Sequence, residues 1–544
     1  MISRVETHYK LAGFGAAFFI TAFILIAFIA LSLSSQSTFD LAKIINDEYL
    51  ANIIKFTLKQ AALSTFISVT LAVFVATALA RRTHFFGRNF ILKLFALPLA
   101  LPPLVGVLAV LGLWGNAGWI KQLAISIGFD EPAFSVFGLS GILIAHVFFN
   151  LPLATRLLLE RIETTPSENW RLAAQLGLPH LSVFKLIEWP AIKTVILGIT
   201  ALVFMLCLTS FTIVLTLGGG PSSTTLEVAI YQALRFDFDP ARAVTLALIQ
   251  LIIIGGFLAL SFKFTKTLPQ TISINKISVR PQTYGRFFKS FDHLVLAIAS
   301  LFIILPLLTI LTEGVTSDLK RLLTTPKVWS SILTSLILAI TSASLAVAMC
   351  WTMIKSIKST NSKYAQAINI ITNSILVMPA IVLGAGWFVL LQRAGMVFSF
   401  TPFLVIIINA FMALPFLYRI LSPAIAQANS QNDKLATSLG IAGWTMFLKI
   451  DLPSLKRPIA LSFAFAMALS IGDLGVIALF GSQDFSTLPL LLFQSLGSYR
   501  TQDAQGLAFI LATLSLGILY LGEQYARQPT AKTTKTSKSK KLGH

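Results

Sequence analysis

The chain has 544 residues, of which 56% are hydrophobic and 12% are charged, and its mean hydropathy is +0.81. A soluble core cannot absorb this much apolar side chain, so the composition excludes an ordinary soluble enzyme and indicates an all-α polytopic membrane protein. The formal charge of +20 raises the question of nucleic acid. The basic residues lie in short clusters between apolar runs, however, so no nucleic-acid partner is expected.

Apolar runs long enough to cross a bilayer, which takes about 20 helical residues, recur along the chain. They predict twelve membrane spans, at residues 11–33, 56–80, 90–114, 136–159, 191–217, 241–262, 294–311, 330–351, 368–391, 403–421, 459–480 and 507–521. The first run is too long for the apolar region of a signal peptide and lacks a clear cleavage pattern. Residues 1–33 are therefore expected to remain as an N-terminal transmembrane helix.

Charged residues between the spans predict the orientation of the chain. Basic clusters such as Arg81 and Arg82 occur in alternate loops, whereas the intervening loops carry acids such as Asp130 and Glu131. By the positive-inside rule, both termini are predicted to be cytoplasmic. The tail 527–544 is basic and has no apolar pattern, so we expect it to be disordered and attracted to anionic membrane lipid.

A segment between the fourth and fifth spans occurs again 263 residues later in the chain. Eight positions of the first copy are identical in the second, namely Asn169, Leu172, Ala173, Leu176, Gly177, Phe184, Ile187 and Pro190. Their counterparts are Asn432, Leu435, Ala436, Leu439, Gly440, Phe447, Ile450 and Pro453. Internal repetition of this kind predicts two fused six-helix halves. Because six is even, the halves are parallel and related by an axis along the membrane normal.

The repeat divides the chain into parts with defined boundaries. The core of the first half is predicted at 56–262 and the second half at 292–521, joined by a cytoplasmic linker at 263–291. The repeated loops are residues 165–190 and 430–453. Both loops fall on the side that the basic clusters place in the cytoplasm.

Each loop is predicted to form a helix, a glycine turn and a second short helix. In the first copy, Thr165 and Pro166 are typical of a helix start with Glu168 as the capping-box partner, and Gly177 suits the left-handed residue that ends a helix. The second short helix is expected to run from Pro179 until just before Pro190. In the second copy the cap pair is Ser430 with Asp433, and the stop is Gly440.

Leu172 and Leu176 share one helix face, with Ala173 close by, and present a small apolar surface on a cytosolic loop. A single loop of this kind equally suits a helix that lies on lipid headgroups or packs on its own span ends. Two copies on the same side of two similar halves favour a docking element.

In each copy the glycine is followed, after nine residues, by Ile, any residue, an apolar residue and Pro. This pattern resembles the EAA loop of ABC importer permeases. The resemblance implies that the loops dock into grooves of two cytoplasmic ATPase subunits. The residues that it assigns to docking are Arg171, Leu172, Ala173, Leu176, Gly177, Ile187, Pro190, Lys434, Leu435, Ala436, Leu439, Gly440, Ile450 and Pro453. The family pattern begins with Glu, where this chain has Arg171 and Lys434, which puts any contact by a loop carboxylate in doubt.

The chain has no G-x-x-x-x-G-K-[ST] phosphate loop and no Gly-Lys dipeptide. We therefore expect it to bind no cofactor itself and to have no ATPase site of its own, with ATP and Mg²⁺ held by partner subunits. Two docking loops in one polypeptide predict one such chain on an ATPase homodimer.

Three longer segments carry a narrower resemblance. Residues 208–251, 378–391 and 468–504 are similar to the permeases of bacterial thiamine ABC importers. That resemblance implies import of thiamine and its phosphates across the bacterial inner membrane, with a periplasmic thiamine-binding protein as partner. Ferric-iron permeases share the fused-halves layout and are the alternative. An ion-coupled secondary transporter would not need two identical loops, and a membrane enzyme would need clustered His, Asp or Cys residues.

Asp473 lies within an apolar span, where an unpaired charge is costly. Under the thiamine hypothesis it lines the substrate pathway and attracts the cationic thiazolium. A hydrogen bond across helices, or a position near the water interface, explains it equally well. The repeat pairs Asp473 with Phe211, and Ser210 and Gly219 complete the candidate pathway. Gly219 also suits a plain turn. No metal site is predicted.

Overall fold

The computed structural model describes residues 4–34, 47–83, 85–128, 135–264, 285–358, 362–375, 378–438, 441, 444–482 and 484–526. Every regular element in these ranges is a helix. Ten of the described helices are long and apolar enough to cross a membrane, or eleven if one bent pair counts as a single span. The chain is thus an all-α polytopic membrane protein, as the composition predicts.

The helices of the first half include α1 (Arg4–Ser34), α3 (Glu48–Arg81), α4 (Arg88–Leu94), α5 (Leu97–Ala100), α6 (Pro103–Trp114), α7 (Trp119–Ser126), α8 (Leu139–Glu163), α9 (Ser167–Gln175), α10 (His180–Val183), α11 (Trp189–Lys193), α12 (Ile196–Leu208), α13 (Phe211–Leu217), α14 (Leu226–Arg235) and α15 (Pro240–Phe264). A π-helical turn, η2 (Phe184–Glu188), joins α10 to α11. The Asp239 side chain caps the start of α15, because it accepts a hydrogen bond from the Arg242 backbone N–H at 3.0 Å.

The second half contains α16 (Arg286–Thr316), α17 (Leu319–Thr324), α18 (Pro326–Lys358), α19 (Ser362–Ile375), α20 (Ala380–Arg393), α21 (Val397–Ser438), α22 (Trp444–Met446), α23 (Leu452–Ile471), α24 (Gly475–Phe480), α25 (Leu488–Gly497) and α26 (Thr501–Ala526). The π-helical turn η4 (Phe447–Asp451) joins α22 to α23 and corresponds to η2. From these π-turns onwards the two halves have corresponding elements, with α12, α13, α14 and α15 matched by α23, α24, α25 and α26.

The third span of each half is broken, which explains part of the difference from the expected twelve continuous spans. Pro102 is the N-cap of α6 and Pro379 is the N-cap of α20, each in an extended conformation with ψ of 139° and 131°. Proline lacks the backbone N–H that a continuous helix would use, so a helix interrupted here can only start again after it. The expected span at residues 368–391 is consequently two short helices, α19 and α20.

The fifth span of each half is also interrupted. In the first half α12 ends at Leu208 and α13 begins at Phe211, and in the second half α23 ends at Ile471 and α24 begins at Gly475. The segment before α12 is bent by 54° relative to it. Interrupted helices leave backbone groups that only a protein interior or a water-lined path can accommodate in a membrane.

The first helix of each half packs on the other half. The α1 helix lies against α18 and α20, and α16 lies against α3 and α6. Trp387 of α20 stacks on Phe23 of α1 with ring centroids 4.6 Å apart, and Thr309 of α16 donates to the Ala109 carbonyl of α6 at 3.2 Å. The two halves are therefore interlocked by an exchange of helices that the hydropathy pattern does not reveal.

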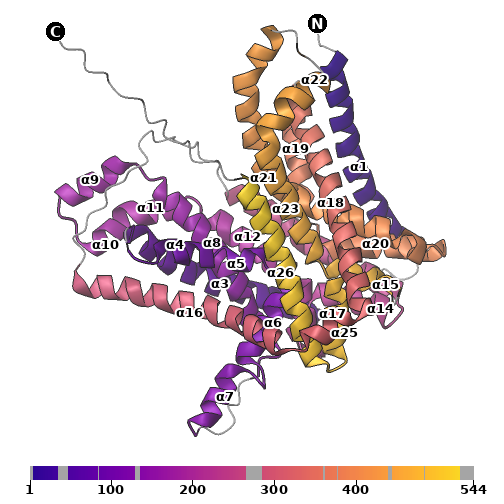
Figure 1. Cartoon of the computed structure of the whole chain (residues 1–544), viewed down its shortest axis with the longest axis horizontal. Coiled ribbons are helices and arrows are strands. Elements are labelled where there is room, and N and C mark those ends of the chain that lie inside the picture. Colours follow the sequence, from indigo (N-terminus) through magenta and orange to yellow (C-terminus); the bar gives the residue numbers. More distant parts are fainter. Residues whose placement is uncertain are drawn as a thin grey trace, which may run out of the picture.

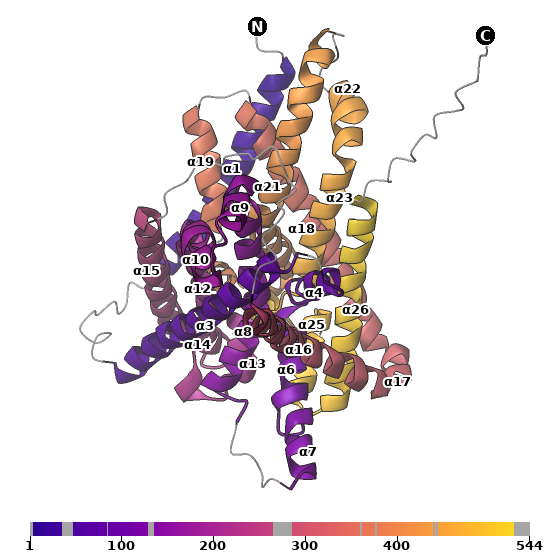
Figure 2. The same cartoon turned by 90° about the vertical axis from the view of Figure 1, so that its left-hand side faces the viewer.

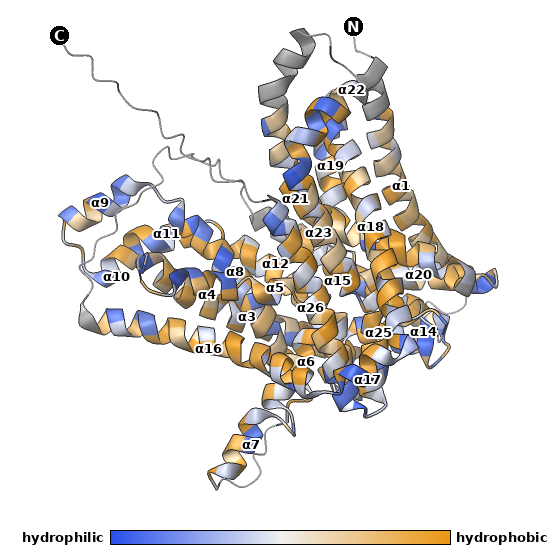
Figure 3. Ribbon diagram, viewed as in Figure 1, coloured by the Kyte–Doolittle hydropathy of each residue, from blue (hydrophilic) through white to orange (hydrophobic). Residues whose placement is uncertain are grey.

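Figure 1 shows α9, α10 and α11 at the left of the molecule and α22 at the top. The helices α14, α17 and α25 lie at the lower right, away from both. In the second view α7 projects from the end of the bundle away from α22 (Figure 2). Most of the bundle is hydrophobic, and hydrophilic residues gather at α9, α14, α17 and α22 (Figure 3). This distribution matches helices that cross a bilayer and loops that leave it.

Candidate functional site

The first helix of the first repeated loop begins one residue later than the sequence predicts. The α9 helix starts at Ser167, and Pro166 is its N-cap in an extended conformation with ψ of 138°. No side chain caps this end, and the buried Thr165 hydroxyl has no hydrogen-bond partner in the described part of the chain. The predicted capping box with Glu168 is therefore wrong, because Pro166 rather than Thr165 is the N-cap and a proline has no side-chain acceptor.

Gly177 ends α9 as predicted. Its φ is +57°, the left-handed region that favours glycine. The Leu178 N–H donates to the Ala173 carbonyl at 3.1 Å, and the Gly177 N–H donates to the Ala174 carbonyl at 3.2 Å. These two hydrogen bonds form a Schellman motif, which satisfies carbonyls at the helix end.

Pro190 does not end the second helical segment, contrary to the prediction. The chain passes from α10 through η2 into α11, which continues past the proline to Lys193. The π-turn finishes at Glu188, so Pro190 falls in the first turn of α11, where a missing N–H costs little.

The side chains of the first loop divide into an exposed and a buried set. Leu172 and Leu176 are 56% and 64% exposed, and Arg171 is exposed beside them. Leu181 of α10 and Leu186 of η2 are exposed as well. We call these four exposed leucines of the first loop the leucine face.

Three other residues assigned to docking lie differently. Ala173 and Ile187 are buried, and Pro190 is half-buried. Ala173 and Ile187 pack the loop onto the body of the protein, and their assignment to docking stays a prediction. The helix periodicity puts Ala173 next to Leu172 in sequence but turns it by about 100° towards the core.

The second loop begins differently from the first. The α21 helix continues without interruption from Val397 to Ser438, so the predicted cap pair Ser430 and Asp433 starts no helix. No glycine or proline lies between Pro423 and Gly440, and the intervening residues all tolerate a helix.

The docking positions of the second copy are described only in part. Lys434, Leu435 and Ala436 belong to α21, but their side chains lie outside the description, and Leu439 and Gly440 lie outside the described residues altogether. Ile450 is half-buried in η4, and Pro453 is exposed in the first turn of α23. The two loops thus share their second segment, from the π-turn onwards.

Each loop contains one buried acid that the sequence prediction did not single out. Glu188 is fully buried, and its carboxylate accepts hydrogen bonds from Arg81 Nε at 2.8 Å and Nη2 at 2.5 Å. Asp451, at the same position of the second copy, is also buried and lies 2.9 Å from Lys355 Nζ. The signal was present, since the repeat offset of 263 aligns an acid two residues before each proline.

Asp473 lies at the interruption between α23 and α24. Its side chain accepts hydrogen bonds from the backbone N–H groups of Gly475 at 3.2 Å and Val476 at 3.3 Å. The carboxylate therefore caps the start of α24, a local contact rather than one across helices.

Ser210, rather than Phe211, corresponds to Asp473. Gly218 and Gly481 end the equivalent helices α13 and α24 with the same type of hydrogen bond, 263 residues apart, and this offset pairs Ser210 with Asp473. The sequence alone pairs Asp473 with Phe211 because residues after α13 match the second half at an offset that is one residue shorter than 263. Ser210 is the N-cap of α13.

The interruptions of the two halves approach one another. A Cβ built on Gly475 would lie 3.7 Å from Cδ1 of Phe211, and one built on Gly472 would lie 3.0 Å from Cβ of Pro102. Three of the four helix breaks thus meet where the halves join. Gly219 lies apart from them, in the turn after α13 with φ of +73°, beside Phe137.

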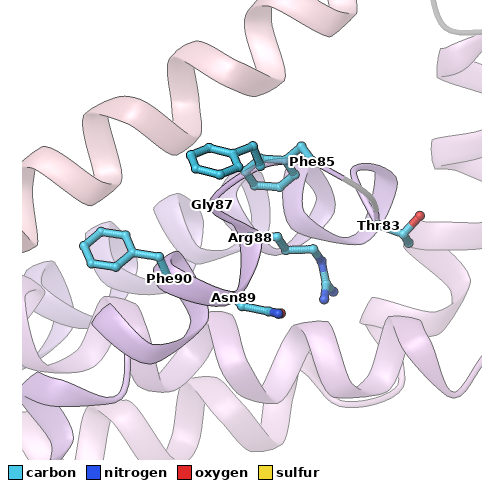
Figure 4. A pocket seen from close by; sticks show the side chains of 7 residues that line it. Thr83, Phe85, Gly87, Arg88, Asn89 and Phe90 are labelled. Atoms are coloured by element: carbon cyan, nitrogen blue, oxygen red, sulfur yellow. The ribbon is translucent and has the colours of Figure 1, made fainter.

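A pocket of about 870 Å³ lies elsewhere, on the connection between α3 and α4 (Figure 4). Its lining comes from one segment, namely Thr83, Phe85, Phe86, Gly87, Arg88, Asn89 and Phe90. It contains none of the residues predicted for docking or for the pathway.

The architecture of two interlocked halves with repeated loops defines a class of transport protein. The chain matches the family of binding-protein-dependent transport system inner membrane components twice, over residues 68–264 and 354–529. These matches cover more than half of the chain, one in each half, and the chain belongs to this family. It is a multi-pass inner-membrane permease component of a binding-protein-dependent transporter.

Individual relatives are similar over nearly the whole chain. The thiamine transport system permease protein ThiP of Brucella abortus (strain 2308) is 46% identical over 484 residues, which cover 88% of each chain. The protein of the same name from Escherichia coli (strain K12) is 40% identical over 510 residues, 93% of this chain and 94% of the relative. That of Haemophilus influenzae (strain ATCC 51907) is 39% identical over 481 residues, 87% and 88% of the two chains.

Proposed function

We propose that this chain is the permease of an ATP-driven importer and that it carries thiamine, together with its phosphates, across the bacterial inner membrane. The observation that carries this proposal is the 46% identity, over 88% of both chains, to a protein named for thiamine transport. Ferric iron is the weaker candidate substrate, because only the layout of two fused halves supports it.

Two copies of a cytoplasmic ATPase bind the two loops. The exposed leucine face of the first loop supports this partner, because exposed apolar side chains on a polar loop are typical of protein interaction sites. The second loop presents Leu448 and Leu452 at 45% and 36% exposure. ATP and Mg²⁺ are bound and ATP is hydrolysed by those subunits, since this chain lacks a phosphate loop.

A periplasmic thiamine-binding protein delivers substrate to the opposite face, and both termini of this chain are cytoplasmic. The positive-inside rule supports this orientation, because the basic clusters such as Arg81 and Arg82 lie on the side of the repeated loops.

The substrate passes between the halves near the broken helices. Discontinuous helices supply backbone groups to substrates near the middle of the bilayer in other transporters. Asp473 is the acidic group at these breaks, and its negative charge attracts the positively charged thiazolium ring of thiamine. Ser210 provides a neutral hydroxyl at the matching position of the first half.

Uptake into proteoliposomes tests the function. The vesicles contain this chain, its ATPase and its binding protein, and uptake of thiamine, thiamine phosphates and ferric iron is measured with ATP inside the compartment that the ATPase faces. Thiamine uptake that requires both ATP and the binding protein is expected.

Two controls separate the alternatives. Vesicles that lack the binding protein should take up little thiamine, and vesicles with an imposed ion gradient but no ATP should take up none. Uptake of ferric iron in preference to thiamine contradicts the substrate, and gradient-driven uptake without ATP contradicts the ATP-driven mechanism.

A further inference from the structure

The two repeated loops are joined to the membrane helices by a buried acid–base pair in each half. Glu188 lies at the end of η2 and Asp451 at the end of η4. Both acids are buried, at 0% and 4% exposure, although the neighbouring Leu186 and Leu448 are 65% and 45% exposed. The acids therefore face the body of the protein while the loop surface around them faces outwards.

Each acid binds the base at one end of the second span of its half. Arg81 is the last residue of α3, and Lys355 lies in the last turn of α18. The pairs are buried on both sides, with side-chain exposures of 6% and 0% for Arg81 and Glu188, and 7% and 6% for Lys355 and Asp451. A buried pair is held by geometry, because separating it leaves an uncompensated charge away from water.

Both acids end a π-helical turn. A π-turn is rare and often marks a functional position in a helix, and here it occurs twice at equivalent places. The wider turn directs the acid towards the second span, while the leucines before it stay exposed. Turn and acid recur in both copies of the repeated loop, and each acid meets a base at the end of the second span of its own half, which argues against a chance contact.

We propose that these pairs are rigid couplings that transmit movement of the docking loops to α3 and α18. The inference rests on the proposed function, because it needs an ATPase that moves the loops. A loop that contacts its span only through apolar side chains would slide, whereas a directional ion pair fixes both position and orientation.

The two couplings differ in stiffness. Arg81 holds Glu188 with two hydrogen bonds and also lies 3.4 Å from Asp292 of α16, which Arg82 contacts at 3.0 Å. This cluster ties the first loop to the exchanged helix of the second half as well. Lys355 Nζ lies 2.9 Å from Asp451 Oδ2, and its ammonium lies 5.5 Å from the Trp351 ring. The planar guanidinium of Arg81 fixes the orientation of Glu188 through two parallel hydrogen bonds, whereas a lysine ammonium acts as a point charge, so the first coupling is the stiffer one.

Neutral variants test the proposal in proteoliposomes with the complete transporter. Glu188→Gln and Asp451→Asn keep the shape of each side chain and remove its charge. Thiamine transported per ATP hydrolysed should fall about tenfold in Glu188→Gln and less in Asp451→Asn, while the ATPase still binds. Glu160→Gln, an exposed carboxylate on α8, is the matched control and should behave as the unmodified chain does.

A charge exchange separates coupling from folding. Lys355→Asp alone should lose coupling, and the double variant Lys355→Asp with Asp451→Lys should regain part of it by restoring the pair. The second half is chosen because Arg81 also contacts Asp292, which an exchange in the first half would leave opposite a carboxylate.

Spin labels test the same point without altering the pairs. Cysteines replace Phe86 near the end of α3, Lys185 in the first loop and Lys449 in the second, which are exposed and are not assigned to docking. The native Cys207 and Cys350 are buried, so they should not react with the label. On trapping the ATPase with ATP, the distance from 86 to 185 should stay constant while the distance from 185 to 449 changes.

The outcomes of these experiments distinguish failure of the coupling from failure of the proposed function. Unchanged transport per ATP in both neutral variants, loss of ATPase binding in either, or a change in the distance 86–185 as large as that in 185–449 overturns the coupling. If the unmodified chain hydrolyses ATP with its partner but takes up no thiamine, the substrate assignment fails, whereas the label distances still test the coupling.

Discussion

Arg235 of α14 donates a hydrogen bond from Nη2 to the backbone carbonyl oxygen of Gly481 at 2.9 Å, which joins the first half to the second across 246 residues. Gly481 follows α24 directly and ends it. The contact lies near α14, on the side of the molecule away from α9 and α22 (Figure 1). In the proposed orientation it holds the outer ends of the halves together.

Replacing Arg235 with alanine should loosen the outer contact between the halves. A hydrogen bond from a charged donor contributes about 1.5–3 kcal/mol, and the lower figure suits this partly exposed side chain. Basal ATP hydrolysis in the absence of binding protein should rise, by roughly tenfold at most, since the outer ends separate more readily. The measurement is ATPase activity of the reconstituted complex.

Arg242→Ala is the control for this experiment, because Arg242 contacts partners of its own half, Asp237 at 3.5 Å and the ring of Tyr49 at 4.8 Å. Equal stimulation by both variants would show that loss of positive charge, rather than the contact between halves, is responsible.

Gly13→Ala should destabilise the packing of α1 on the other half. A Cβ at this position would lie 2.3 Å from Ser356 Oγ and 2.8 Å from the Thr352 carbonyl, so α1 or α18 must shift. Overpacking of this kind costs about 1–3 kcal/mol. The thermal unfolding midpoint in detergent should fall.

Gly15→Ala provides the matched comparison, because nothing lies within 4 Å of the added methyl group there. Alanine is a better helix former than glycine by about 1 kcal/mol, so this midpoint should stay level or rise. If the two variants unfold alike, α1 does not depend on this close approach.

Gly177→Val should weaken binding of the ATPase. The residue has φ of +57°, and an L-residue in this conformation costs about 1–2 kcal/mol, with more for a branched side chain. The turn after α9 would open and the leucine face would lose its shape. Co-purification of the ATPase and thiamine uptake measure the effect.

Asparagine tolerates the left-handed region better than valine, so Gly177→Asn should retain most binding. Full binding by the Val variant would mean that the turn does not shape the docking surface.

Two substitutions of Asp473 separate its two roles. Gly475 donates to Oδ1 and Val476 to Oδ2 of the carboxylate, so asparagine keeps one accepting oxygen and removes the charge, whereas alanine removes both the acceptors and the charge. Asp473→Asn should preserve the thermal unfolding midpoint and slow thiamine uptake. Asp473→Ala should also lose about 1 kcal/mol of stability through the missing cap.

Wild-type uptake by a folded Asp473→Asn variant would limit this carboxylate to capping α24. The rate is compared at equal amounts of assembled transporter, so that loss of stability in the alanine variant is not mistaken for loss of transport.

Local features of the loops could be predicted well only where one residue type decides the conformation. Gly177 stops α9 because glycine alone enters the left-handed region at low cost. The helix start at Thr165 and the cap pair at Ser430 were wrong, because capping preferences are weak and neighbouring backbone overrides them.

The sequence by itself determined the membrane class, the two halves and the positions of the paired loops. Hydropathy depends on residues adjacent in the chain, and a repeat needs only comparison of the chain with itself, so neither requires knowledge of the packing. Only the tertiary structure decided which helices are exchanged between the halves and which acids are buried. Arg81 and Glu188 are 107 residues apart in the chain, and their contact exists only because α3 and the first loop fold against each other.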